Sequence, residues 1–259
     1  MDGFTACFNC TCAPLSACVR TSTNQRVNMS EFQCKVTAIS PLTGVVYKVE
    51  LTPAQPVDFK AGQYIMVHMG EKDKRPFSIA NPAFDNGRIE LHIGADEKNA
   101  YATEVLDRMR SEGEITLSGG HGEANLQSDG SDIILIAGGT GFSYTWSILQ
   151  QALKDNPDAN VTLYWGGRNQ SDLYLFDELT ALAAKHPNFT FAPVVEFPEE
   201  GWQGKTGWVH KAVMTDHTDL SNKQVYIAGR FEMAKVARDD FAECGLTTDK
   251  LFGDAYAFI

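Results

Sequence analysis

The sequence predicts a two-domain fold, an N-terminal antiparallel β-barrel followed by a doubly wound α/β domain with a parallel sheet. Three observations lead to this prediction. The chain has 259 residues, of which 43% are hydrophobic, which is enough for a core in each of two ordinary domains. Short strand-like segments fill residues 33 to about 118, and strands alternate with helices after Gly122. We expect a leader at residues 1–30, the barrel at 31–125 and the α/β domain at 130–259.

Five segments of the predicted barrel are rich in β-branched and apolar residues, and glycine or proline separates many of them. They are Cys34–Ile39, Val45–Leu51, Gln63–Met69, Arg88–Ile93 and Glu114–Leu117. Arg88–Ile93 alternates between polar and apolar residues, so we expect it to have one buried and one solvated face. A helix is expected over Ala100–Arg110, where apolar residues recur every four positions. Several short strands with one helix favour a small antiparallel barrel.

The predicted α/β domain begins after a polar linker at Asn125–Ser131. The next segment, Asp132–Ala137, is almost wholly apolar, which suits a strand buried on both faces of a parallel sheet. Gly245 follows the last expected helix and suits its C-terminal cap. The further helices are expected at Ser143–Lys154, Leu173–Lys185 and Phe231–Glu243, and the further strands at Val161–Trp165, Phe189–Val195 and Val225–Ala228.

The charge balance and the N-terminus limit the classes of function and location. A net charge of −11 disfavours nucleic acid as a partner, and a phosphate-bearing ligand would need a local positive site. No apolar run reaches the length of a membrane span. Leu15–Cys18 looks like a lipoprotein cleavage box, but residues 1–14 carry Asp2 and no Lys or Arg. We therefore predict a cytoplasmic protein without a secretory signal.

Four of the six cysteines lie in the leader, at Cys7, Cys10, Cys12 and Cys18. Their spacing fits neither the paired zinc pattern nor the plant-type iron–sulfur spacing. We expect a flexible tail of reduced thiols and no metal site, with metal binding by the leader as the alternative. The strand pattern starts soon after Met29, which makes Met29 an alternative start of the functional chain.

A glycine-rich turn at residues 137–143, here called the glycine loop, lies between the buried strand and the following helix. Its glycines allow positive φ and a close approach of backbone to ligand, and the helix N-terminus offers unpaired N–H groups and a positive dipole end. The loop therefore predicts a pyrophosphate seat made of Gly138, Gly139, Thr140, Gly141 and Phe142. It is not a full GxGxxG because Tyr144 holds the third glycine position, and a tight turn without a ligand is the alternative.

Two further positions of the α/β domain suggest contacts with a nucleotide. Arg168 follows the second strand, where an NAD-specific fold often carries an acidic residue. A guanidinium there suits the 2′-phosphate of NADP or stacking on adenine, and a surface arginine is the alternative. We therefore expect either NADH or NADPH. Gly229 ends a later strand just before a helix that includes Met233, and it leaves room for a flat ring or forms only a structural turn.

Residues 75–82, RPFSIANP, place polar side chains and an aromatic ring on a strand that prolines interrupt. Arg75 can pair with a phosphate or a carbonyl edge, and Ser78 can hydrogen-bond a ring nitrogen. Phe77 can pack on a ring or a sugar chain, and Pro76 limits the strand to a sheet edge or a bulge. The segment therefore suggests a site for a flat, polar-edged ligand. The alternative is an edge strand in which Arg75 pairs with Asp73.

These motifs together resemble the ferredoxin–NADP⁺ reductase superfamily. Arg75–Ser78 resembles its flavin-binding RxYS motif, with Phe77 where tyrosine is common, and the glycine loop resembles its pyridine-nucleotide loop. Ala228–Met233 resembles its CGPxxM motif, with alanine for cysteine and arginine for proline. Within the superfamily, residues 34–259 most resemble the bacterial NAD(P)H:flavin oxidoreductases, through runs such as IELHIGA, LIAGGTGFSY and YIAGRFEMAK.

The resemblance implies a barrel of the flavin-binding type and reduction of free riboflavin, FMN or FAD by NADH or NADPH. It implies hydride transfer from nicotinamide C4 to flavin N5, with Ser78 orienting the flavin ring as the catalytic residue and the flavin acting as a diffusible substrate. The reduced flavin would serve a flavin-dependent monooxygenase or a luciferase, and we expect a monomer. The implied flavin-binding residues are Arg75, Pro76, Phe77, Ser78, His92, Ile93, Gly94 and Tyr256. The implied nucleotide-binding residues are Gly138, Gly139, Thr140, Gly141, Phe142, Arg168, Gly229 and Met233.

Trp146 departs from the pattern, because the family carries an arginine one turn into the helix after the glycine loop. This departure puts the inherited nucleotide preference in doubt. Two other functions remain open from the sequence, a reductase that keeps its flavin and passes electrons to a protein partner, and a nucleotide-sensing module without catalysis.

Overall fold

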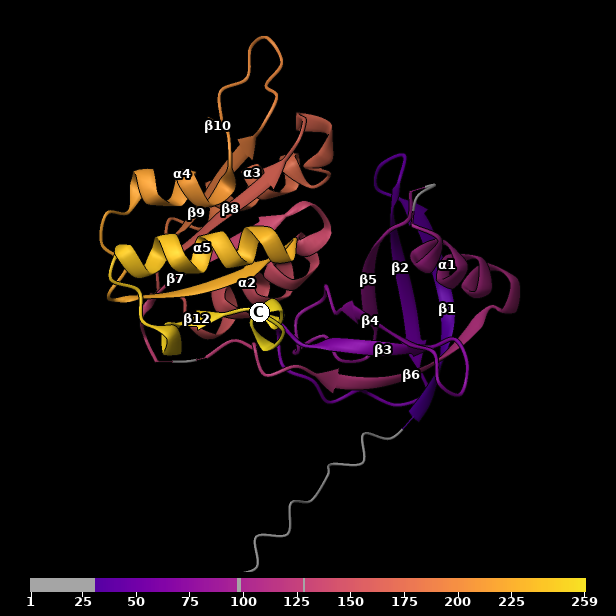
Figure 1. Ribbon diagram of the computed structural model, residues 1–259. Coiled ribbons are helices and arrows are strands. Elements are labelled where there is room, and N and C mark those ends of the chain that lie inside the picture. The colour runs from indigo at the N-terminus through magenta and orange to yellow at the C-terminus, as the bar shows by residue number, and fades with distance from the viewer. Residues whose placement is uncertain (1–30, 97–98, 128) are drawn as a thin grey trace, which may run out of the picture.

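The computed structural model describes residues 31–96, 99–127 and 129–259. The predicted leader with its four cysteines, and the alternative start at Met29, lie outside the described residues. Two six-stranded sheets lie side by side, and the C-terminus lies between them (Figure 1). The first sheet is antiparallel and the second is parallel, so the predicted fold class is confirmed.

The first sheet, here called the barrel, has the strand order β4-β3-β6-β1-β2-β5. Its strands are β1 (Glu31–Pro41), β2 (Val46–Pro53), β3 (Tyr64–His68), β4 (Lys74–Ser78), β5 (Ile89–Gly94) and β6 (Glu114–His121). The two ends of the sheet meet just beyond β4, where the backbone N–H of Ala80 donates to the carbonyl of Glu90 over 2.8 Å. Helix α1 (Ala100–Glu112) adds Val105 and Met109 to the core inside the barrel. Strand β4 is at the sheet edge, where Pro76 is tolerated as predicted.

The prediction that Arg88–Ile93 has a solvated face is wrong. All residues from Ile89 to Ile93 are buried. The apolar members face the barrel core, and the polar members Glu90 and His92 lie on the outer face of β5. That outer face is covered by side chains of the α/β domain, because the ring of His92 stacks on that of Phe142, the first residue of the helix after β7, with centroids 6.1 Å apart. The alternation therefore marks two different buried environments.

The second sheet has the strand order β10-β9-β8-β7-β11-β12, and all its pairs are parallel. Its strands are β7 (Asp132–Gly138), β8 (Val161–Gly167), β9 (Phe189–Val195), β10 (Lys205–Thr206), β11 (Lys223–Ala228) and β12 (Leu251–Phe252). Helices α4 (Val209–Asp216) and α5 (Phe231–Glu243) cover the face turned to the viewer in Figure 1, and α2 (Phe142–Asp155) and α3 (Phe176–Lys185) pack against the other face. The two layers bury the central strand β7 on both sides, as predicted.

Some elements of this sheet were not predicted. Helix α4 was missed, as were the two-residue strands β10 and β12. The helix expected from Leu173 begins at Phe176 and follows a short 3₁₀ turn at Gln170–Asp172. No helix in the described part of the chain is long and apolar enough to cross a membrane.

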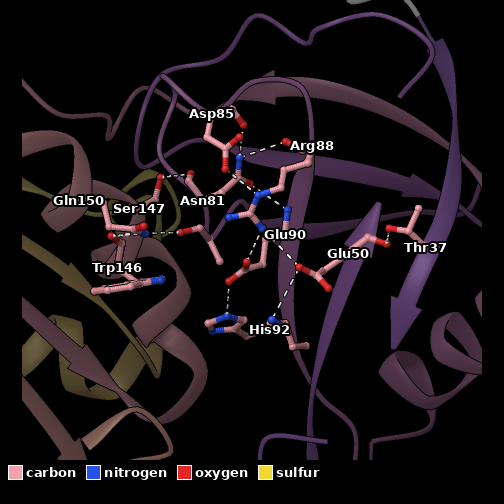
Figure 2. A network of polar contacts seen from close by, with 12 residues as sticks. Thr37, Glu50, Asn81, Asp85, Arg88, Glu90, His92, Trp146, Ser147 and Gln150 are labelled. Atoms are coloured by element: carbon pink, nitrogen blue, oxygen red, sulfur yellow. Dashed lines mark hydrogen bonds and ion pairs between the residues drawn. The ribbon is translucent and has the colours of Figure 1, made fainter. Parts of the chain in front are cut away.

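The strand order predicts a ligand crevice at the carboxyl ends of the parallel strands, here called the carboxyl edge of the sheet. The chain runs outward from β7 to β8 and β9, and then returns to the other side of β7 to form β11. In open α/β sheets, ligands bind outside the carboxyl ends of the strands at such a reversal. The barrel abuts this edge through α2, where Ser147 Oγ donates to the carbonyl of Asn81 over 2.8 Å and Gln150 Nε2 to that of Ala80 over 3.2 Å (Figure 2).

Candidate active site

A single cavity of about 1200 Å³ lies between the barrel and the carboxyl edge of the parallel sheet. Its barrel wall includes Pro76, Phe77, Ser78, His92, Gly94 and Tyr101. Its sheet wall includes Gly138, Gly139, Thr140, Gly141, Arg168, Gly229 and Met233. Ser78 and the glycine loop therefore open onto the same space, which is what two stacked ring systems would require.

Ser78 ends strand β4 and lies opposite Tyr64 of β3 in the register of the sheet. It is partly exposed, and its hydroxyl forms no hydrogen bond with another described residue. Pro76, with its fixed φ, and Phe77 precede it on the same cavity wall. A hydroxyl without a protein partner at the wall of a cavity is available to a ligand's ring nitrogen or carbonyl.

Arg75 does not line the cavity, although the resemblance implies a flavin-binding role for it. Its guanidinium is buried and forms ion pairs with Asp73 at 2.6 Å and Glu104 at 2.8 Å, and it also donates to the carbonyl of Tyr101. The ion pair with Asp73 is the alternative that the sequence left open. Its hydrogen bond lowers the pKa of the Asp73 carboxyl. The guanidinium lies 4.5 Å from the ring centroid of Tyr101, which itself faces the cavity.

The other implied flavin residues divide between the cavity and the core. His92 and Gly94 line the cavity, whereas Ile93, between them on β5, points into the barrel core. Tyr256 packs beneath α5 and donates its hydroxyl to the carbonyl of Ala234 over 3.0 Å. Its neighbour Asp254 lines the cavity in its place.

The glycine loop packs closely on the end of β11. A Cβ added to Gly141 would lie 2.4 Å from the carbonyl oxygen of Ala228, and one added to Gly138 would lie 3.0 Å from the sulfur of Met233. Gly139 has φ +55, and a Cβ there would meet nothing within 4 Å. The loop is therefore shaped by glycine on its protein side and leaves open space on its cavity side. Phe142 turns away from the cavity, since it is fully buried and stacks on Trp165 at 3.8 Å.

The arginines that line the cavity lie on its sheet side. The guanidinium of Arg168, at the end of β8, forms no hydrogen bond or ion pair with a described residue, and neither does that of Arg230, which precedes α5. Helices α2 and α5 begin at this same edge without a side-chain cap at their N-termini. Free guanidinium groups and helix N-termini make this end of the cavity the one that suits phosphate groups.

Several cavity residues were not predicted from the sequence. Tyr174 lies between β8 and α3, and Trp208 and His210 lie at the start of α4. Trp208 is 62% exposed, and no sequence signal marks it as a cavity residue. His210 is buried, and its ring nitrogens form no hydrogen bond with any residue that the structure describes, although Nε2 lies 3.4 Å from the carboxyl of Asp240. Asp254 is a further cavity residue that was not predicted, and burial raises the pKa of its carboxyl to about 6.

Within the described ranges, no group of His, Cys, Asp and Glu could hold a metal ion.

Two different family models match the two segments that form the cavity walls. Residues 34–126 match the family model for an oxidoreductase FAD-binding domain, and residues 135–239 match that for an oxidoreductase NAD-binding domain. The NAD(P)H-flavin reductase of Aliivibrio fischeri is 51% identical over 233 residues, which are 87% of this chain and 98% of the relative. That of Vibrio harveyi is 49% identical over 88% of this chain and 99% of the relative.

The chain belongs to the NAD(P)H-flavin reductase family. The fold of this family member also resembles more distant oxidoreductases. The Amycolatopsis cytochrome P450 reductase GcoB superimposes with a TM-score of 0.80 at 25% identity, covering 87% of this chain and 69% of that one. The ferredoxin reductase of carbazole 1,9a-dioxygenase has a TM-score of 0.77 at 22% identity, covering 88% and 69%, and shows likeness of fold alone.

The residues present in this flavin reductase fit the two groups that its domains imply. On the barrel side, Ser78 offers a hydroxyl that has no hydrogen-bond partner among the described residues. On the sheet side, the open space beside Gly139 and the free guanidinium of Arg168 suit a dinucleotide. The two ends are continuous, so ring systems bound at each can meet between them.

Proposed function

We propose that this protein reduces free riboflavin, FMN or FAD with NADH or NADPH, as a cytoplasmic monomer. The single observation that carries the proposal is that Ser78 and the glycine loop open into one cavity. We assign the flavin to the domain at residues 31–125 and the nucleotide to the domain at 130–259. The two ring systems supply the redox chemistry themselves, as a hydride passes from nicotinamide C4 to flavin N5.

The protein's part in this reaction is to bind the flavin and the nicotinamide and to orient their rings. No nucleophile or acid–base pair is needed at the reacting atoms, so the cavity needs only to hold the two rings about 3–3.5 Å apart. We assign to Ser78 the hydrogen bond that orients the flavin ring near N5. Phe77 and Pro76 form the wall beside it. The barrel approaches the glycine loop closely beside the cavity, since a Cβ added to Gly94 would lie 3.0 Å from the side chain of Thr140.

We assign the nucleotide to the sheet side of the cavity because positive charge is concentrated there. With a net charge of −11 the protein as a whole repels a dinucleotide, so a local positive site is required. Arg168, Arg230 and the N-termini of α2 and α5 supply one at the carboxyl edge of the sheet. We place the pyrophosphate at the glycine loop and the nicotinamide beside Gly229, where the absence of a side chain leaves room for a flat ring.

The pairing of Arg75 supports a flavin that comes and goes. The resemblance implies that this arginine helps to hold the flavin, yet its guanidinium is already paired with Asp73 and Glu104. Among the described residues of the barrel wall, no lysine or arginine lines the cavity. A weaker hold on a phosphate favours release of the reduced flavin. We propose a flavin-dependent monooxygenase or a luciferase as its acceptor.

One measurement tests the proposal and its competitors. The absorbance of purified protein is recorded first, and NADH consumption is then followed with and without added riboflavin. Colourless protein that oxidises NADH only when riboflavin is present supports the proposal. Yellow protein whose flavin survives gel filtration identifies a reductase that retains its flavin. Binding of NADH without oxidation in the presence of riboflavin identifies a nucleotide-sensing module.

A further inference from the structure

One polar contact joins the two walls of the cavity on the side of the glycine loop. The imidazole Nδ1 of His92, on β5 of the barrel, lies 3.1 Å from the hydroxyl of Tyr174, which follows β8 of the parallel sheet. Both residues line the cavity. Their rings also meet edge to face, with centroids 5.4 Å apart. Neither the glycine loop nor the RPFS segment accounts for Tyr174, so its hydroxyl needs a separate explanation.

The orientation of the His92 ring is fixed from behind by Glu90. The carboxylate of Glu90 lies 3.0 Å from His92 Nε2 and 2.5 Å from Nη1 of Arg88 (Figure 2). Burial acts to raise the pKa of Glu90, but the hydrogen bonds from His92 and Arg88 outweigh it and lower the pKa to about 2. An ionised carboxylate only accepts hydrogen bonds, so Nε2 of His92 carries a proton. In the neutral ring, Nδ1 then accepts the hydrogen bond from the Tyr174 hydroxyl.

Tyr174 carries the contact onward to the glycine loop. Its ring packs edge to face on Trp165, with centroids 4.9 Å apart. The indole Nε1 of Trp165 donates to the carbonyl of Gly139 over 3.0 Å. A continuous path of oriented side chains therefore runs from the strand that holds one cavity wall to the backbone that forms the other.

We propose that Glu90, His92 and Tyr174 are positioning residues that fix the distance and angle at which the nicotinamide meets the flavin. The inference rests on the proposed function. Helix α2 joins the two walls through its contacts to Asn81 and Ala80, and the contact between His92 and Tyr174 joins them beside the glycine loop. Aromatic pairs form over centroid distances of about 4.5–7 Å, whereas a hydrogen bond holds donor and acceptor within about 2.5–3.2 Å and close to linear. Displacement of reacting groups by about 1 Å can cost on the order of 100-fold in rate.

The test is Tyr174→Phe, which removes the hydroxyl and keeps the ring. We expect kcat to fall about three- to tenfold, while the KM values for NADH and riboflavin stay within about twofold. The primary isotope effect with NADH deuterated at the transferred position should rise, and the long-wavelength charge-transfer absorbance of the nicotinamide–flavin complex should weaken. The matched control is Tyr164→Phe on β8. It also removes one tyrosine hydroxyl, but this hydroxyl donates to Asp216 over 2.7 Å, and Tyr164 does not line the cavity.

A pair of His92 variants separates the two sides of the imidazole. Asparagine places its amide near the position of Nδ1 and can still partner Tyr174, whereas glutamine reaches toward the position of Nε2 and keeps only Glu90. We expect His92→Asn to retain more of kcat and of the charge-transfer band than His92→Gln. The inference is overturned if glutamine serves as well as asparagine, or if Tyr174→Phe changes only KM and leaves kcat and the isotope effect at wild-type values. A wild-type protein without riboflavin-dependent NADH oxidation would refute the proposed function instead.

Discussion

The indole nitrogen of Trp165 donates a hydrogen bond to the carbonyl oxygen of Gly139 over 3.0 Å. Trp165 is fully buried on β8, so the glycine loop is held from beneath by the neighbouring strand. This contact keeps Gly139 at φ +55, a conformation that residues with a side chain rarely adopt. The loop is therefore shaped before a nucleotide arrives, and its cavity side stays open.

Gly139→Val should abolish nucleotide binding and spare flavin binding. Valine is strained at a positive φ, and its side chain would fill the open space where we place the pyrophosphate. We expect the KM for NADH to rise more than about tenfold, with the dissociation constant for riboflavin, measured by fluorescence quenching, within about twofold of wild type. Gly201→Val is the control, since Gly201 also has a positive φ and open space but lies outside the cavity. Equal loss of both ligands in Gly139→Val would contradict separate sites.

Ser78→Ala should lower the rate of flavin reduction with little effect on flavin affinity. If the hydroxyl orients the flavin ring in the transition state, its removal should cost about 2–4 kcal/mol, or roughly 30- to 1000-fold in kcat. Steady-state kinetics with riboflavin and NADH, together with a single-turnover hydride step, measure this. Ser40→Ala on β1, away from the cavity, is the control. A rise in the KM for riboflavin with an unchanged hydride step would rule out the orienting role.

Arg75→Lys should affect stability more than catalysis. The guanidinium joins Asp73, Glu104 and the carbonyl of Tyr101, and an ammonium group cannot reproduce these forked contacts. We expect a loss of about 1–2 kcal/mol in the free energy of unfolding, measured by urea denaturation, and a KM for riboflavin within about threefold of wild type. Arg110→Lys on α1, whose ion pair with Asp107 is exposed, should cost less than about 0.5 kcal/mol. A stable Arg75→Lys protein that binds riboflavin tenfold more weakly would restore the flavin-binding role.

Asp254→Asn should stabilise the protein in a pH-dependent manner. Burial raises the pKa of Asp254 from 3.8 to about 6, so the folded state binds this proton more tightly than the unfolded state does. Stability therefore falls as pH rises from about 4 to 6, and the full cost of the buried charge remains above pH 6. The uncharged asparagine avoids this cost, which we put at roughly 1 kcal/mol after solvent screening.

Urea unfolding at pH 7.5, 5 and 4 measures the effect of Asp254→Asn. The gain over wild type should be largest at pH 7.5 and should vanish near pH 4. The control is Asp58→Asn, an exposed carboxyl outside the cavity. A gain that stays constant across this range would show that shape, and not the charge of Asp254, is responsible.

Local patterns in the sequence correctly predicted the elements whose place in the sheet depends on their own residues alone. The apolar run at Asp132–Ala137 predicted a strand covered on both faces, and Pro76 predicted a sheet edge for its strand. The alternation in β5 predicted its two faces but not that both are buried, because the covering side chains come from residues 142 and 174. That same alternation places Ile93 in the core between His92 and Gly94, which the motif-based assignment overlooked.

The parts of the site that were missed depend on contacts between distant segments. The segment at Trp208–His210 has no recognisable motif, and it lines the cavity because α4 begins at the carboxyl edge of the sheet. Tyr256 is one of several aromatic residues near the chain end, and only the fold shows that it packs under α5 while Asp254 turns to the cavity. The sequence left open whether Arg75 pairs with a ligand or with Asp73. The fold adds Glu104 of α1, which is distant in sequence, as a further partner.

The cavity between the barrel and the sheet is one chamber, with Ser78 on one wall and Gly139 on the other. Two substrates that react inside one chamber must both be present before either product leaves. Double-reciprocal plots of initial rate at several fixed riboflavin concentrations should therefore intersect. Parallel lines would mean that the oxidised nucleotide departs first and that the reducing equivalents wait on the protein for the second substrate.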